Sequence, residues 1–207
     1  MRIHFGNIPG STGDQSEIEG LHEIRGPRAR MGFLLASLTG FVLLIFPITT
    51  ICLVLTYLVM SRPEPGGGEI QPTAWWGALL ACIVFIPLHE LLHLVLHPQG
   101  GRSDQSILVL WPAKFRFGVY YEGSMSRTRW LLMRIAPFMV LSVIPAVLWT
   151  AFQYVPYNYD LKTFISVVVV LNAVGCGGDV IAMFLVLFQV PPSASMVFRA
   201  GRAYWRP

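Results

Sequence analysis

Four long apolar stretches, separated by short polar segments, dominate the hydrophobic pattern of the chain. Each exceeds the ~20 residues that a helix needs to cross a bilayer whose hydrocarbon core is about 30 Å thick. The pattern therefore predicts four membrane-spanning helices, which cover about residues 31–60, 75–97, 130–155 and 161–190.

The segment between the second and third spans has a different pattern. Residues 106–121 are rich in β-branched and aromatic side chains and are followed by a Gly-Ser turn, which predicts two short strands. The expected fold class is an all-α membrane protein of about four transmembrane helices, with a short membrane-surface β-hairpin between spans two and three. The expected organisation is a polar tail at 1–30, a four-span membrane domain at 31–190 with its strand-rich loop at 98–128, and a basic tail at 191–207.

Composition agrees with a membrane protein. Of the 207 residues, 54% are hydrophobic and only 13% are charged, whereas soluble domains carry about a quarter charged residues. The formal net charge of +4 is small and no dense Lys/Arg cluster is present, so nucleic-acid binding is not expected. The three cysteines lie in apolar runs without a CxxC pair, which argues against a disulfide scaffold or a cysteine-rich zinc site.

Basic residues flank the predicted spans unevenly, and this asymmetry predicts orientation. Twelve Lys and Arg residues fall in the two tails and the strand-rich loop, but only Arg62 and Lys162 fall on the opposite side. Arg134 lies inside the third span and is expected to extend to the membrane surface. We therefore expect a multi-pass protein of the cell (inner) membrane with both termini in the cytoplasm.

The second span contains an HExxH sequence, His89-Glu90-Leu91-Leu92-His93. Four residues advance a helix by about 400°, so both imidazoles lie on one face and can reach a single tetrahedral metal ion. Glu90 projects to the side, where it can take a proton from a water at that ion. The alternative is that these polar groups form inter-helix hydrogen bonds or line a pore.

A catalytic zinc usually has a third protein ligand. His97 is excluded by distance, since it lies roughly 12 Å along the helix from His89; it is expected to be an interfacial or supporting polar group. Asp179 is the only acid inside the fourth span, at a depth that approximately matches the histidine pair, and it is the expected third ligand. Glycines at 175, 177 and 178 allow close backbone approach or local unwinding beside it.

Asn172 lies two helical turns before Asp179 and admits two interpretations. It is a possible transition-state stabiliser that donates to a developing oxyanion, or it is an amide that bridges helices. An aspartyl protease is excluded, because Asp160 and Asp179 lie on one span about 28 Å apart if helical. A GxSxG sequence is absent, which removes the support for serine hydrolase chemistry.

These residues resemble a known family. The chain resembles the putative zincin peptidases, a family of small bacterial membrane proteins. The resemblance rests on HExxH in the second of four spans, a strand-rich loop, Gly123-Ser-Met-Ser-Arg127 before Ala136-Pro137-Phe138, and Asn with Gly-Asp in the last span. They are similar, at a distance, to the site-2 intramembrane zinc proteases, although Val180 follows Asp179 and no proline lies nearby. The resemblance covers roughly residues 75–190.

The resemblance implies zinc ligands at His89, His93 and Asp179, with Glu90 as the general base and acid. It also implies that an extended substrate adds to a strand edge near residues 106–121. The resulting hypothesis is a Zn²⁺-dependent intramembrane protease that cleaves a membrane protein or peptide and whose other partner is the lipid bilayer. Two alternatives stay open, namely a non-catalytic metal-binding scaffold and zinc hydrolysis of a non-peptide bond such as a lipid amide. The oligomeric state is not predicted.

Overall fold

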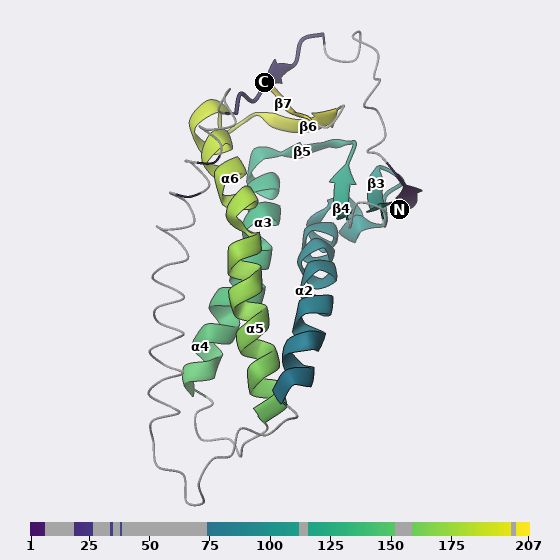
Figure 1. Ribbon diagram of the computed structural model, residues 1–207. Helices are drawn as coiled ribbons and strands as arrows, with labels where there is room; N and C mark the ends of the chain where they lie inside the picture. Colours follow the sequence, from purple (N-terminus) through teal and green to yellow (C-terminus); the bar gives the residue numbers. More distant parts are fainter. Residues whose placement is uncertain are drawn as a thin grey trace, which may run out of the picture.

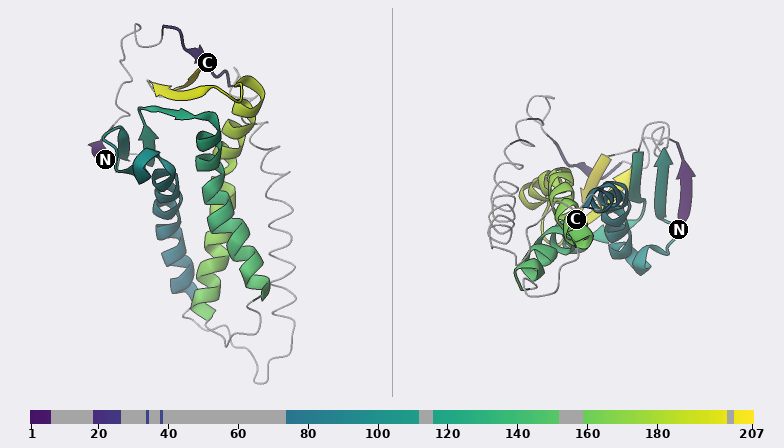
Figure 2. Two further views of the ribbon diagram at one scale, coloured as in Figure 1. Left: turned by 180° about the vertical axis from the view of Figure 1, so that it is seen from behind. Right: turned by 60° about the horizontal axis from the view of Figure 1, so that its bottom comes forward.

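A computed structural model describes residues 1–6, 19–26, 34, 38, 74–111, 116–151, 159–199 and 202–207. Its helices run side by side along one axis, and its strands gather at one end of them (Figure 1). Both chain termini lie at this strand end, as the left view in Figure 2 also shows. The first predicted span, 31–60, lies outside the described residues apart from two helical positions, Leu34 and Leu38.

The second predicted span is helix α2, Ala74–Leu96, which contains Pro87. Many of its apolar side chains, such as Leu79, Ile83 and Val95, are more than half exposed in the isolated chain. A helix of this composition is energetically suited to lipid rather than to water. Among the described residues, two helices are long and apolar enough to cross a membrane, Trp76–Leu96 and Arg127–Leu148, and the total is three if a bent helix pair forms one span.

The third predicted span is a continuous but irregular helix. It comprises α3 (Arg127–Phe138), a π-helical turn η4 (Met139–Val143) and α4 (Ile144–Ala151). The side chain of Ser126 caps its N-terminus by accepting a hydrogen bond from the backbone N–H of Arg129 at 3.3 Å. Pro137, inside α3, removes one helical N–H donor, and the π turn begins two residues later.

The fourth predicted span is broken. Helix α5 (Tyr159–Gly175) and helix α6 (Gly177–Gln189) meet at Cys176 with a bend of 42° between them. The break coincides with the predicted glycine-rich stretch, and it puts Asp179 in the first turn of α6. The N-terminal end of a helix carries partial positive charge, which stabilises a carboxylate there.

The strands form two small sheets, so the all-α prediction was too simple. One sheet has the order β1-β3-β4, with β1 (Arg2–Phe5) parallel to β3 (Ser106–Trp111), and β3 antiparallel to β4 (Arg116–Tyr121). The predicted hairpin between spans two and three is therefore confirmed as β3–β4. A single 3-10 turn, η2 (Pro98–Gly101), connects α2 to it.

The second sheet pairs a strand from the N-terminal segment with strands from the C-terminal segment. Its order is β2-β7-β6-β5, all antiparallel; the members are β2 (His22–Glu23), β7 (Arg202–Arg206), β6 (Ser195–Arg199) and β5 (Ser124–Ser126). Parts of the two terminal segments expected as polar tails are thus strands. Backbone hydrogen bonding to strands far away in the sequence orders these segments, and local composition does not reveal it.

The main buried cluster joins this second sheet to the helix ends. It is built from α3, α6 and the strands, and its largest members include Trp130, Met133, Tyr121 and Met196. Helix α2 packs along α5, and α3 packs against α6. These two contacts bring the HExxH face of α2, the middle of α3 and the break between α5 and α6 to the same level.

Candidate metal centre

The side chains of His89, His93 and Asp179 meet at the level of the helix break. Nε2 of His89 and Nε2 of His93 are 3.1 Å apart, and Oδ2 of Asp179 lies 3.1 Å from the first and 3.3 Å from the second. Both His93 and Asp179 are buried. The predicted meeting of one helical turn of α2 with the start of α6 is therefore present in the structure.

The size of this triangle suits a small divalent cation. Two ligand atoms held about 2.0–2.1 Å from one ion at the tetrahedral angle are about 3.4 Å apart. The three observed separations, 3.1, 3.1 and 3.3 Å, are close to that value. An ion slightly above the plane of the three atoms would contact all of them and keep a fourth position open.

A backbone carbonyl that Pro137 leaves without its helical donor orients the imidazole of His93. Pro137 has no N–H, so the carbonyl of Met133, four residues earlier on α3, lacks its usual helical donor. Nδ1 of His93 lies 2.8 Å from that carbonyl oxygen. A carbonyl can only accept, so Nδ1 carries the proton and Nε2 keeps its lone pair for the triangle.

An amide orients His89 in the same way. Nδ2 of Asn172, on α5, donates to the carbonyl of Pro137 at 2.9 Å and to Oγ of Ser142 at 2.8 Å. Its Oδ1 therefore faces Nδ1 of His89, 2.9 Å away, and accepts a hydrogen bond from the N–H of that nitrogen. Asn172 is fully buried with each of its polar atoms engaged. This arrangement favours the helix-bridging interpretation over the oxyanion donor.

When both histidines are neutral, three electron-pair donors face one another with no hydrogen atom between them. Such an arrangement is repulsive until a cation, either a metal ion or a proton, lies among them. Imidazole nitrogen and carboxylate oxygen are ligands that zinc accepts, and histidine ligands that donate through their second nitrogen are typical of metal sites. The residues present therefore fit a zinc ion.

Glu90 points to a strand edge. Its Oε2 accepts a hydrogen bond from the backbone N–H of Val119 at 2.9 Å. Val119 lies on β4, whose other edge pairs with β3, so this N–H is on the outer edge of the sheet. Among the described residues, no strand pairs with that outer edge.

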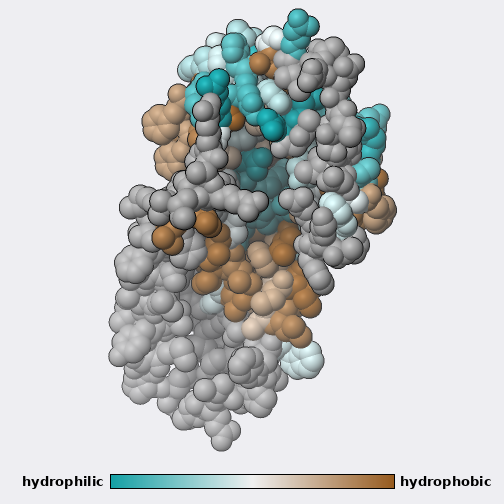
Figure 3. All heavy atoms as spheres, turned by 45° about the horizontal axis from the view of Figure 1, so that its top comes forward, coloured by the Kyte–Doolittle hydropathy of each residue, from teal (hydrophilic) through white to brown (hydrophobic). Residues whose placement is uncertain are grey.

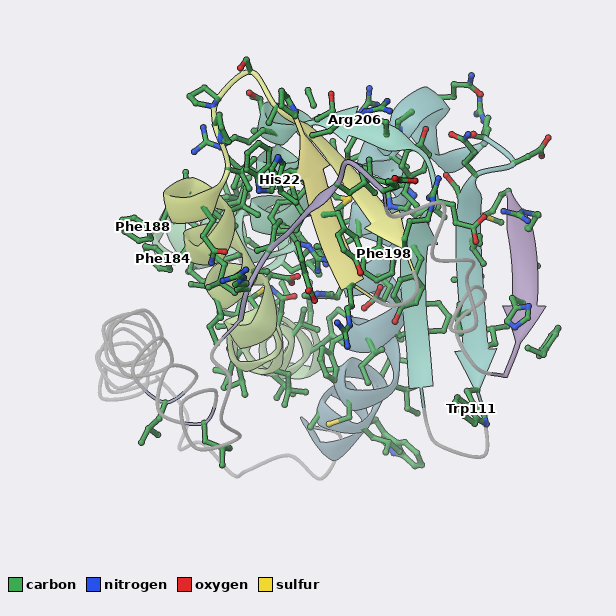
Figure 4. All side chains as sticks on the ribbon, turned by 90° about the horizontal axis from the view of Figure 1, so that it is seen from above. His22, Trp111, Phe184, Phe188, Phe198 and Arg206 are labelled. Atoms are coloured by element: carbon green, nitrogen blue, oxygen red, sulfur yellow. The ribbon has the colours of Figure 1, made fainter. Side chains whose placement is uncertain are left out.

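A small, partly open cavity of about 30 Å³ lies beside these groups. Its walls include Val119, Met133 and Arg134, which contact Glu90, His93 and Asp179 respectively. Figure 3 shows a hollow with hydrophilic residues at its floor on this side of the molecule. The opposite wall comes from β6, where Phe198 lies toward β4, with its ring 5.4 Å from that of Tyr120 (Figure 4).

The zincin resemblance is confirmed by comparison with known families. Residues 82–195 match the family described as "Putative zincin peptidase", which is more than half of the chain. The chain belongs to this family. No curated protein and no solved structure matches the chain. The matched residues include α2 from Cys82, the β3–β4 hairpin, α3 and both halves of the broken span, and they end where β6 begins. The similarity to site-2 proteases stays a prediction.

Cys176 is a further neighbour of His89. His89, Cys176 and Asp179 offer ligand atoms within 4.8 Å of one another. However, Sγ of Cys176 is 3.9 Å from Nδ1 of His89, the nitrogen on the far side of the ring from Asp179. One imidazole cannot direct both nitrogens at the same ion, so the compact set of three is His89, His93 and Asp179.

His97 lies outside this set, as its distance along the helix predicted. It is almost completely buried, and its Nδ1 lies 3.2 Å from Oγ of Ser106 at the start of β3. Burial is the main cause that lowers its pKa to about 4, with smaller contributions from nearby positive groups. His97 is therefore a neutral group that connects the end of α2 to the hairpin.

Arg134 is the residue that the sequence interpretation placed wrongly. Instead of extending to the membrane surface, its Nη1 lies 2.7 Å from Oδ1 of Asp179. Its position inside an apolar span was the available signal, because a charge at that depth pairs with another charge. The pairing with Asp179 itself was not predictable, since it depends on which face of α3 packs against α6.

Proposed function

We propose that this protein is an intramembrane zinc metallopeptidase that hydrolyses a peptide bond in a membrane-embedded or membrane-adjacent protein. The observation that carries the proposal is the triangle of His89 Nε2, His93 Nε2 and Asp179 Oδ2, with sides of 3.1–3.3 Å. Membership of the zincin peptidase family supports the peptidase chemistry. The apolar helices that carry the three residues support a site within the membrane domain.

In this proposal His89, His93 and Asp179 hold the zinc ion. When bound, zinc supplies Lewis-acid activation of a water molecule and of the substrate carbonyl. Glu90 takes the proton of the attacking water and returns it to the departing amine. Before a substrate binds, its hydrogen bond to Val119 holds the carboxylate to the side of the histidine pair. Asn172 and the Met133 carbonyl keep both histidines in the tautomer that can bind the metal.

The outer edge of β4 is the proposed substrate platform. A peptide bond inside a membrane helix has its hydrogen bonds made internally, so a helical substrate must unwind before cleavage. An extended substrate can recover those bonds by adding to the unpaired edge of β4. The Val119 N–H, which contacts Glu90, is on that edge, so a paired substrate would pass directly beside the general base.

The cavity next to β4 would receive a substrate side chain. Most of the side chains that line it are apolar, among them Met125, Trp130, Met196 and Phe198, which suits a small apolar group near the scissile bond. The cavity is lined by residues of β4, β6 and β7, so it lies at the strand end of the helices. The charge asymmetry of the loops supports a cytoplasmic location for this end in a multi-pass protein of the inner membrane.

The test compares wild type with Glu90→Gln, because this change removes the general base and leaves the zinc ligands in place. Both proteins are produced in cells, and new protein N-termini in the membrane fraction are identified by mass spectrometry. The proposal expects peptides that appear with wild type and disappear with Glu90→Gln, although both purified proteins contain zinc. Identical peptide sets would favour the non-catalytic scaffold. A difference confined to lipids in the same membranes would favour hydrolysis of a lipid amide.

A further inference from the structure

Arg134 gives the two oxygens of Asp179 different partners. Nη1 of Arg134 is 2.7 Å from Oδ1, whereas Oδ2 faces the Nε2 atoms of His89 and His93. The two residues come from different helices, α3 and α6, so the contact also connects the third span to the fourth. Asp179 is buried, and the side chain of Arg134 is 29% exposed along the cavity.

The guanidinium is held in this place against an energetic cost. Its Cζ lies 5.0 Å from the ring centroid of Trp130, which is a favourable cation–π contact. Its Nε is buried and has no hydrogen-bond partner among the described residues, and a buried donor without a partner destabilises a fold. In this orientation the guanidinium of Arg134 keeps its contact with Asp179.

We propose that Arg134 is a positioning residue of the metal centre, and this inference rests on the proposed function. By binding Oδ1, Arg134 leaves only Oδ2 for the metal and makes Asp179 a ligand through one oxygen. A carboxylate that binds a metal through both oxygens would occupy the position that a catalytic zinc keeps open for water or substrate. Arg134 therefore determines the coordination number as well as the orientation of Asp179.

The chemistry of arginine suits this role. Its guanidinium stays charged at every physiological pH and donates in a fixed plane, so it directs one hydrogen bond at one oxygen. A lysine would keep the charge but not the planar geometry or the stacking on Trp130. Arg134→Lys is thus expected to retain part of the effect, and the neutral variants Arg134→Gln and Arg134→Met are expected to lose it.

The experiment measures metal binding without a substrate. Purified wild type, Arg134→Lys, Arg134→Gln and Arg134→Met are titrated with Zn²⁺ against a chelator, and their Co²⁺ forms are compared by absorption spectroscopy. Arg127→Met is the matched control, since Arg127 lies on the same helix, also has a buried Nε without a partner among the described residues, and donates to the backbone of Leu187 at 3.3 Å, away from Asp179. Unfolding temperatures of all variants report whether each one folds.

The inference predicts that Arg134→Gln and Arg134→Met bind zinc about tenfold or more weakly than wild type, the loss typical of an outer-shell partner. Their Co²⁺ absorption is expected to weaken as Asp179 moves to binding through both oxygens, with Arg134→Lys between them and wild type. The control should match wild type in both measurements. Wild-type affinity and spectrum in whichever neutral variant folds would overturn the role of Arg134 alone, and failure of both to fold would assign it a structural role. Absence of metal from wild type would instead overturn the proposed function.

Discussion

Val119 donates its backbone N–H to Oε2 of Glu90, 2.9 Å away, and so connects the edge of a sheet to the HExxH helix. The two residues are 29 positions apart and belong to β4 and α2. This contact places the proposed general base and the proposed substrate edge within one hydrogen bond. A substrate carbonyl that pairs with β4 would compete with Glu90 for the same N–H.

Removal of that N–H is expected to impair substrate pairing and leave the metal centre intact. Val119→Pro removes the donor at an outer-edge position, where a sheet tolerates proline best. We expect wild-type zinc content and at least about a tenfold loss of cleavage, equal to 1.4 kcal/mol. Val119→Ile, which keeps the N–H, is the control and should cleave as wild type does. Full activity in Val119→Pro, measured on a substrate found by the N-terminal analysis, would show that β4 does not bind the substrate.

Replacement of Pro137 is expected to stabilise the helix and weaken the metal centre together. Pro137→Ala restores an N–H that can donate to the Met133 carbonyl, which now accepts from His93. The two donors would share one acceptor, so His93 would be held less firmly. We expect zinc affinity to fall by about threefold to tenfold, while the unfolding temperature stays equal or rises, because proline disfavours a helix interior. An unchanged zinc affinity would show that the carbonyl accepts both donors without competition.

The stability of the fold is expected to depend on pH through His97. Its pKa is lowered to about 4 in the folded protein, mainly by burial, against an ordinary value of 6.5, so below pH 6.5 the unfolded chain binds the proton more readily. Stability should therefore be highest above pH 6.5 and fall as the pH approaches 4. The loss between pH 6.5 and 5 amounts to about 2 kcal/mol.

Thermal unfolding at a series of pH values measures this dependence. His97→Gln should flatten the curve between pH 4 and 6.5 relative to wild type, because the variant has no imidazole to protonate. The exposed His22 supplies the control, and His22→Gln should leave the wild-type slope in place. A slope in His97→Gln as steep as that of wild type would assign the pH dependence to other groups.

The residues of the proposed site were predictable because helical periodicity and depth in the membrane are local properties of the sequence. Four-residue spacing puts His89 and His93 on one face, and a lone acid in the fourth span at a similar depth identifies Asp179. The structure places the three ligand-type atoms within 3.3 Å of one another. The β3–β4 hairpin was predictable for the same reason, since its alternation is continuous in the sequence.

Contacts between segments distant in the sequence were not predictable. Strand β2 pairs with β7, where His22 is opposite Trp205, and β1 pairs with β3, where Arg2 is opposite Ile107. Neither pairing leaves a signal in the polar composition of the first residues. Pro137 could be recognised as a helix irregularity, but the sequence does not say which imidazole uses the carbonyl that it frees.

The most direct test of the central claim is the zinc content per chain of wild type, Asp179→Ala and Cys176→Ser, purified in parallel and measured by mass spectrometry of the metal. The proposed site predicts one zinc per chain in wild type and in Cys176→Ser, and almost none in Asp179→Ala, because of these two residues Asp179 alone contributes an atom to the triangle of 3.1–3.3 Å. Zinc retained by Asp179→Ala and lost by Cys176→Ser, or no zinc in wild type, would contradict it.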